Sequence, residues 1–268
     1  MPGPADSLLL TVLGSGTSMG VPSLGCECRV CRSSDPRDNR TRASLLVSHA
    51  GRNVVIDTTP DFRSQALRAG LKRLDALVFT HAHADHILGF DDIRPFNMRQ
   101  KFSMPVFASD DTQAILRRTF AYVFDGLPTL STIPQVTLHT ISGPFHPLAS
   151  DSALFVPIPL IHGDQQILGF RVGRAAYLTD FSALPPSSRP LLLGLDDLIL
   201  DALRDDPHPM HLTVEQALAV VSDLAPRRAW FTHIAHDLPH EETNTRLARL
   251  GFPHVQLAYD GLTIEVRP

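Results

Sequence analysis

Residues 80 to 86 read Thr80-His81-Ala82-His83-Ala84-Asp85-His86, so three histidines and one aspartate fall within six residues. The run follows an apolar stretch, residues 74–80, which predicts a buried β-strand. Imidazole and carboxylate groups together suit zinc, manganese or iron. Four ligands that point in different directions from one loop favour two neighbouring metal ions over a single ion. The alternative interpretation is a surface loop with incidental histidines.

The rest of the chain predicts an α/β fold with both strands and helices. Strands are expected at residues 8–13, 45–49, 53–56, 136–141, 154–160, 168–172, 176–178, 198–201, 229–232 and 262–266. Helices are expected at residues 61–69, 110–120, 213–224 and 241–250. The polar stretch 31–42 reads as a surface loop. Because no linker or repeat divides the chain, we expect one domain, residues 1–268, with two sheets between helices.

The His-x-His-x-Asp-His pattern resembles the hallmark of the metallo-β-lactamase superfamily, and every position of the hallmark is present. The resemblance implies an αββα sandwich with two mixed sheets and two divalent metal ions, Mn or Zn. It assigns one ion to His81, His83 and His162, and the other to Asp85, His86 and His233, with Asp180 bridging both. It also matches Asp57 to an early aspartate, which we expect to accept a hydrogen bond from a ligand imidazole.

The cysteines form a second candidate metal site. All three lie between Cys26 and Cys31, a poor arrangement for a disulfide framework. A structural zinc needs four ligands, so with Cys26, Cys28 and Cys31 a histidine must complete the set, and we choose His236. Since His233 and His236 share one short loop, a zinc bound there should also hold the loop that positions His233. The alternative is a set of reduced thiols.

The cysteine run, together with the glycine-rich residues 13–22 before it, narrows the resemblance. It is similar to the branch typified by phosphoribosyl 1,2-cyclic phosphate phosphodiesterase, which carries a structural zinc with three cysteines and one histidine. The resemblance extends from Leu8 to Tyr259-Asp260-Gly261. Ribonuclease Z is a neighbour of this branch, but the sequence has no obvious long arm for gripping tRNA.

Hydrolysis of a phosphodiester also needs an acid for the leaving oxygen, and histidine suits that task near neutral pH. His211 is preferred to His208 because His211-Leu212-Thr213 resembles the His-x-Thr element that carries the acid in ribonuclease Z and its relatives. We count His211 and Asp85 as the catalytic residues. Candidate substrate-binding residues are Arg94, Ser15, Thr17 and Ser18. The remaining histidines His139, His146, His240 and His254 are expected at the surface.

Composition limits the partners. The formal charge of −4, from 24 basic and 28 acidic residues, gives no strong signal for nucleic-acid binding. No segment is long and apolar enough for a membrane helix, and residues 1–6 lack the pattern of a signal peptide, so we expect a cytoplasmic protein. A homodimer is left open.

The sequence therefore predicts a dinuclear metal-dependent phosphodiesterase, with a small-molecule phosphodiester as its partner. The substrate is expected to be a small cyclic phosphate or a nucleotide, attacked by a hydroxide held between the two metals. The alternatives are an RNA 3′-end processing nuclease of ribonuclease Z type, and a metal-bound ligand sensor without turnover.

Overall fold

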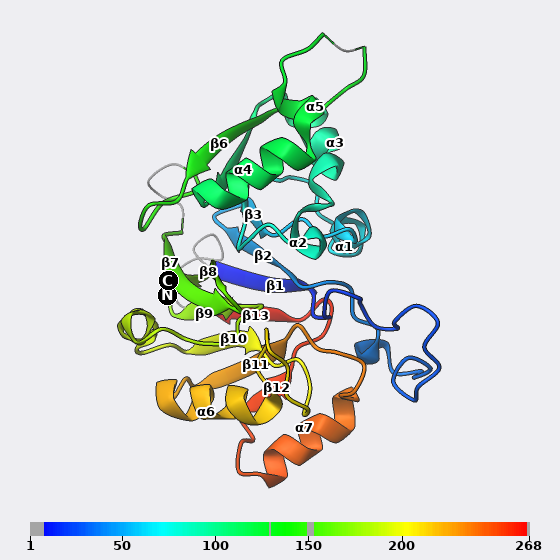
Figure 1. Ribbon diagram of the computed structural model, residues 1–268, viewed down its shortest axis with the longest axis vertical. Helices are drawn as coiled ribbons and strands as arrows, with labels where there is room; N and C mark the ends of the chain where they lie inside the picture. The colour runs from blue at the N-terminus through cyan, green and yellow to red at the C-terminus, as the bar shows by residue number, and fades with distance from the viewer. Residues whose placement is uncertain (1–7, 129, 149–152, 267–268) are drawn as a thin grey trace.

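The computed structural model describes residues 8–128, 130–148 and 153–266. Two β-sheets lie face to face with helices on both outer sides, which confirms the αββα sandwich (Figure 1). Residues 1–6, on which the prediction of no signal peptide rests, lie outside the described residues. Among the described residues, every helix is too short or too polar to cross a membrane.

Both sheets are mixed. In the first, the strands follow the order β13 (Thr263–Val266), β1 (Leu8–Gly14), β2 (Ser44–His49), β3 (Arg52–Ile56), β4 (Ala76–Val78), β5 (Met104–Ala108) and β6 (Val136–Thr140). In the second, the order is β12 (Val255–Leu257), β11 (Arg228–Thr232), β10 (Asp197–Asp201), β9 (Ala175–Leu178), β8 (Gln165–Val172) and β7 (Phe155–His162). Strands β3 to β6 are parallel, as are β9 to β12, and the other pairs are antiparallel.

The helices divide between the two outer faces. The first sheet is covered by α1 (Phe62–Arg68), α2 (Ala84–Ile87), α3 (Arg94–Gln100) and α4 (Asp110–Thr119), with the short η2 (Phe90–Ile93). The second is covered by α6 (Val214–Leu224) and α7 (His240–Arg249). Shorter elements are η1 (Pro36–Asp38), α5 (Ala121–Phe124) and η3 (Pro186–Leu192).

Apolar residues fill the space between the sheets. In β10, Ile199 packs toward the first sheet, whereas Leu198 and Leu200 pack toward α6 and α7. In β3, Ile56 lies between the sheets and Val55 faces the helices. Such strands are buried on both faces, which explains why their sequences are continuous apolar runs.

The predicted bounds of some strands and helices differ from those in the structure. The strand expected at residues 74–80 is only Ala76–Val78, because Thr80 already turns to donate to Asp57. Strand β5 and helix α3 were not predicted, since Pro105 and Pro95 obscure their patterns. Proline is nevertheless compatible with the first turn of a helix.

Two expectations of surface exposure are wrong. The polar stretch 31–42 contains Asp38 and Arg40, which are 5% and 1% exposed. Their charges are buried because they pair with each other and with backbone groups. His240, expected at the surface, is also buried, because it begins α7 under this stretch.

The packing of the sheets yields a test of the single-domain prediction. Replacing the buried Ile199 by Ala should lower the free energy of unfolding by about 2–5 kcal/mol. Fluorescence of Trp230 on β11 and far-UV circular dichroism should give one coincident urea transition. Leu250→Ala, at an exposed position, is the control. Two separate transitions would contradict a single cooperative domain.

Candidate metal centre

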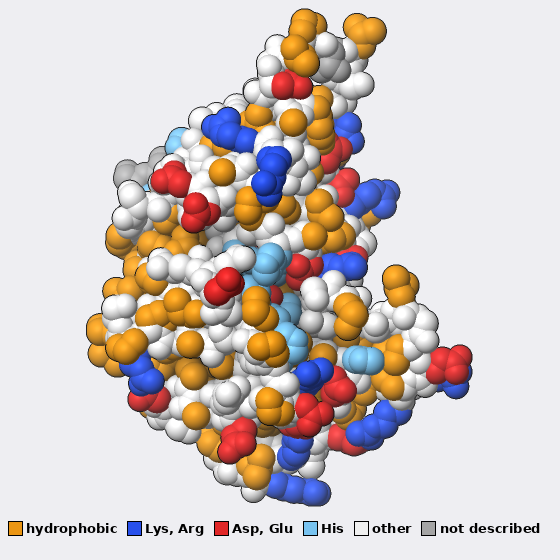
Figure 2. Space-filling view, viewed as in Figure 1, with side chains coloured by type: hydrophobic (Ala, Val, Ile, Leu, Met, Phe, Trp, Pro, Cys, Tyr) orange, Lys and Arg blue, Asp and Glu red, His pale blue; other side chains and the backbone are white. Residues whose placement is uncertain are grey.

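Strand ends bring the candidate ligands together from distant parts of the sequence. His81 follows β4, His162 ends β7, Asp180 follows β9 and His233 follows β11. Figure 2 shows histidine side chains gathered near the middle of the face in view, between the two halves of the sandwich.

One group of ligand atoms comes from His81, His83 and His162, and these atoms lie within 4.8 Å of one another. The ring centroids of His83 and His162 are 5.0 Å apart, and those of His81 and His83 are 4.6 Å apart. Burial lowers the pKa of His162 to about 4, so its imidazole is neutral at neutral pH. A neutral imidazole is the form that binds a metal.

A second group comprises Asp85, His86, Asp180 and His233. The two carboxylate oxygens of Asp180 face different imidazoles, with Oδ2 at 3.1 Å from His86 Nε2 and Oδ1 at 2.9 Å from His233 Nε2. Asp180 also lies within 4.8 Å of the ligand atom of His162. This single carboxylate therefore adjoins both groups.

The donor chemistry fits divalent metal ions. The buried Nε2 atoms of His81, His86 and His233 have no partner with hydrogen-bond geometry among the described residues, although Asp180 faces the last two at 3.1 and 2.9 Å. Such atoms are costly to leave unpaired. On the opposite side of three of the rings, His81 Nδ1 lies 3.0 Å from the Thr80 hydroxyl, His86 Nδ1 2.8 Å from Asp57 and His162 Nδ1 3.0 Å from the Met210 carbonyl. This arrangement turns each Nε2 toward the cluster, as metal-binding histidines require.

Backbone conformation at the site is unusual. Asp57, Asp180 and His233 have φ angles of 65°, 58° and 57°, in the left-handed region that residues other than glycine rarely adopt. Each follows the end of a strand, where the chain turns sharply. Left-handed backbone costs about 1–2 kcal/mol per residue, so neighbouring contacts must hold these three residues in place.

His211 lies beside both groups. Its ring centroid is 4.6 Å from that of His233 and 5.0 Å from that of His162. Its Nδ1 is 3.3 Å from an oxygen of Asp201, which leaves Nε2 on the opposite edge of the ring. The pair gives His211 a fixed orientation next to the cluster.

Asp201 is a site residue that the sequence analysis missed. Its buried carboxylate adjoins His211 and also lies 3.4 Å from His233 Nδ1, and it accepts the Leu212 N–H at 2.9 Å. A signal was present, because Asp201 ends the strand predicted at residues 198–201, much as Asp180 closely follows the one predicted at 176–178.

The three cysteines and His236 also come together. His236 Nδ1 is 3.2 Å from the Cys26 sulfur, 3.5 Å from that of Cys28 and 3.4 Å from that of Cys31. Three sulfurs around one imidazole nitrogen have the composition of a four-ligand zinc site.

The predicted substrate-binding residues lie in other surroundings. The backbone N–H groups of Ser15, Gly16 and Thr17 donate to Asp260, Thr41 and Ile234, so the packing of this loop already uses the donors that a phosphate needs. Ser18 is exposed, and its carbonyl accepts from Arg42.

Arg94 forms an ion pair at 2.6 Å with Asp91 and donates to the Thr132 carbonyl. The structure therefore does not bring Arg94 or the backbone of residues 15–17 into the ligand groups.

Comparison with known proteins agrees with this geometry. The Beta-lactamase superfamily domain matches residues 52–234. The crystal structure of a new diphosphatase from the PhnP family has a TM-score of 0.89 and 49% sequence identity, over 97% of each chain. The chain therefore belongs to the metallo-β-lactamase superfamily, in the branch that contains the PhnP family. Its two groups of candidate metal ligands lie at strand ends of this fold.

Curated relatives carry several names. An octanoyltransferase of Porphyromonas gingivalis is 37% identical over 253 residues, which are 94% of this chain and 50% of that protein. A ribonuclease Z of Bradyrhizobium diazoefficiens is 45% identical over 56 residues, 20% of this chain and 19% of that protein. The chain spans about half the length of the curated relatives with the longest matches.

The cysteine cluster can be tested by metal analysis. We predict that Cys28→Ser lowers the zinc content of the purified protein by one ion per chain, because it removes one of four ligands. Ser33→Ala, on the same loop, is the matched control. Equal zinc content in wild type and Cys28→Ser, measured by elemental analysis, would refute a zinc at this cluster.

Proposed function

We propose that the chain is a dinuclear metal-dependent phosphodiesterase acting on a small cyclic phosphate or a nucleotide phosphodiester. The observation that carries this proposal is the position of Asp180, whose carboxylate adjoins both ligand groups. In this proposal His81, His83 and His162 hold one ion, and Asp85, His86 and His233 hold the other, with Asp180 shared. The ions are Mn or Zn, and a structural Zn occupies the cysteine cluster.

When bound, two divalent ions lower the pKa of water and stabilise the negative charge that develops on a phosphate. The protein supplies the remaining chemistry. Asp57 accepts from His86 Nδ1 and so aims Nε2 of that ring at the cluster. Asp201 orients His211, which in the proposed role carries a proton on Nε2 and donates it to the leaving oxygen.

A phosphoanhydride is a second candidate substrate class, favoured by the 49% identity with the PhnP family diphosphatase. A diphosphate and a phosphodiester present the same reacting group, a phosphorus atom with an oxygen leaving group. The same residues therefore serve both reactions, and only the leaving group differs.

RNA processing receives less support from the surface of the protein. The segment that follows α5 projects from one end of the molecule (Figure 1), as an RNA-gripping arm does. Residues 119–135, which include this segment, contain neither lysine nor arginine. Binding to a nucleic-acid backbone depends on such charges. A sensor without turnover would be favoured by a missing ligand, and all seven predicted ligands are in the two groups.

The proposal is tested by a substrate screen of the protein loaded with manganese or zinc. The panel contains cyclic phosphates, cyclic dinucleotides, bis(p-nitrophenyl) phosphate, linear diphosphates and a tRNA precursor. Hydrolysis of a small phosphodiester supports the proposal, and diphosphate cleavage alone supports the second candidate. Turnover of the tRNA precursor alone, or no turnover, would overturn both. The cytoplasmic location stays a prediction from the sequence, and the oligomeric state stays open between monomer and homodimer.

The role of Asp180 predicts a large effect on rate. Asp180→Ala should reduce hydrolysis by at least about 10²- to 10³-fold while the protein still folds, because the shared carboxylate sets the charge and spacing of the site. Asp223→Ala, in an exposed ion pair with Arg189, serves as the control. Near-normal turnover by folded Asp180→Ala would contradict a bridging role.

The acid role of His211 is tested through the leaving group. His211→Ala should slow substrates with alkoxide leaving groups by about 10²- to 10⁴-fold, because an alkoxide needs a proton to depart. Release of p-nitrophenolate, a stable anion, should be slowed much less. His254→Ala, at an exposed position, controls for loss of a histidine. An equal loss for both leaving groups would show that His211 is not the acid.

A further inference from the structure

The loop that carries His233 and His236 lacks regular secondary structure. Residues 233–239 lie between β11 and α7, and His233 begins them in a left-handed conformation. Such a conformation persists only where surrounding contacts hold it. The zinc expected at His236 is one such contact, and the structure contains others that need no metal.

Two of these contacts are made by backbone groups. Ile234 donates its N–H to the Ser15 carbonyl at 2.9 Å and accepts from the Thr17 N–H at 3.1 Å. Ala235 donates its N–H to the Leu203 carbonyl at 2.9 Å. The carbonyl groups of Ala235 and Leu238 are left for another partner.

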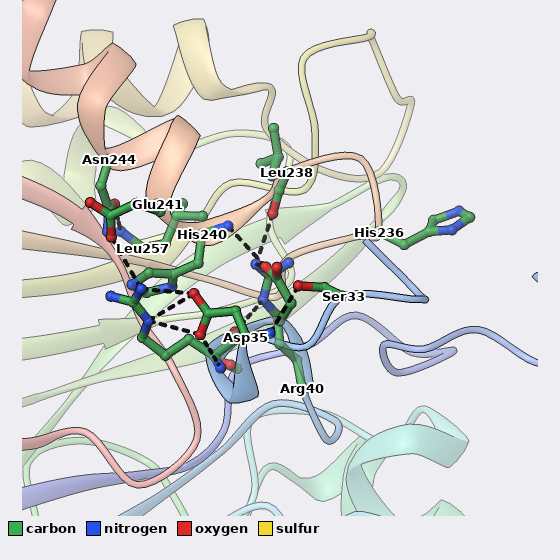
Figure 3. A network of polar contacts seen from close by, with 12 residues as sticks. Ser33, Asp35, Arg40, His236, Leu238, His240, Glu241, Asn244 and Leu257 are labelled. Atoms are coloured by element: carbon green, nitrogen blue, oxygen red, sulfur yellow. Dashed lines mark hydrogen bonds and ion pairs between the residues drawn. The ribbon is translucent and has the colours of Figure 1, made fainter. Parts of the chain in front are cut away.

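That partner is the side chain of Arg40. Its Nη1 donates to the Ala235 carbonyl at 3.1 Å, and its Nη2 donates to the Leu238 carbonyl at 2.7 Å (Figure 3). The guanidinium thereby spans the loop, with one bond on each side of His236. Arginine suits this task because its planar fork presents several donors in a fixed geometry.

Arg40 is itself held rigidly. Its Nη2 also binds Asp38 at 2.9 Å, and its Nε donates to the Arg37 carbonyl at 3.2 Å. Its backbone exchanges two hydrogen bonds with Val21, just before the cysteines. Burial lowers the pKa of Arg40 to about 10, so the group stays charged at neutral pH. Burying a charge is costly unless it is paired, as here.

From these contacts we infer that Arg40 is a positioning residue, which holds the 233–238 loop and thereby His233 at the metal centre. This inference rests on the proposed role of His233 as a ligand. Arg40 ties the loop to the cysteine-bearing segment directly, without passing through the thiolates. The loop therefore has two independent anchors, the cysteine cluster at His236 and the guanidinium at Ala235 and Leu238.

The test is a manganese titration of protein that keeps its zinc but has been stripped of its catalytic ions, with free Mn²⁺ measured by electron paramagnetic resonance. His233→Ala should abolish one of the two Mn²⁺-binding steps. At that same step, Arg40→Met should lower the affinity for Mn²⁺ by about 10- to 100-fold, the usual effect of removing a residue that supports a metal ligand. The step assigned to His81, His83 and His162 should stay close to wild type. Arg37→Met is the matched control, since that side chain binds Asp35 and Glu241 instead.

The outcomes separate the inference from the proposed function. Folded Arg40→Met with wild-type affinity at both steps overturns the role of Arg40 alone. Equal weakening of both steps also overturns it, because it indicates general destabilisation. A wild type that takes up no ion at the His233 step overturns the two-ion proposal and this inference together.

A second variant covers the case in which Arg40→Met does not fold. Arg40→Lys keeps a buried cation but loses the fork, so it should show a smaller loss at the same step. Unchanged affinity in folded Arg40→Lys then overturns the inference.

Discussion

Ile56, Tyr177 and Ile199 are buried against other apolar side chains between the two sheets, and this packing holds the sheets face to face. The ligand groups lie just beyond the ends of β4, β7, β9 and β11. The meeting of ligands from the two sheets therefore depends on this apolar packing. Without that apolar layer, Asp180 on the second sheet would not lie beside His86 on the first.

The burial of strands between the sheets explains which site residues the sequence could predict. Strands buried on both faces appear as apolar runs, and a polar residue directly after such a run, such as His162 or Asp180, is conspicuous. The histidine-rich run 81–86 is contiguous in the sequence, so it predicts a metal site without a structure. Asp201, by contrast, gains its role only through contact with His211 and His233, and the sequence alone does not contain that contact.

Buried charged side chains are poorly predicted by the sequence. Composition places Arg40 and Asp38 on the surface, because charged side chains are almost never buried unless paired. Their pairing partners include backbone carbonyls from residues 235 and 238, nearly two hundred positions along the chain. In the glycine-rich loop, the sequence suggests backbone N–H groups that could bind a phosphate. In the structure, the N–H groups of residues 15–17 instead donate to Asp260, Thr41 and Ile234.

The wide spread of the ligands along the chain has a thermodynamic consequence. Only residues 81–86 are neighbours along the chain, whereas His162, Asp180 and His233 lie beside them only in the folded sandwich. A metal that binds the folded state but barely the unfolded one shifts the equilibrium by mass action, by about 4 kcal/mol at a thousand times its dissociation constant. Scarcity of metal would therefore weaken the whole sandwich, and lengthen the time each chain spends open to proteases, rather than merely emptying a pocket.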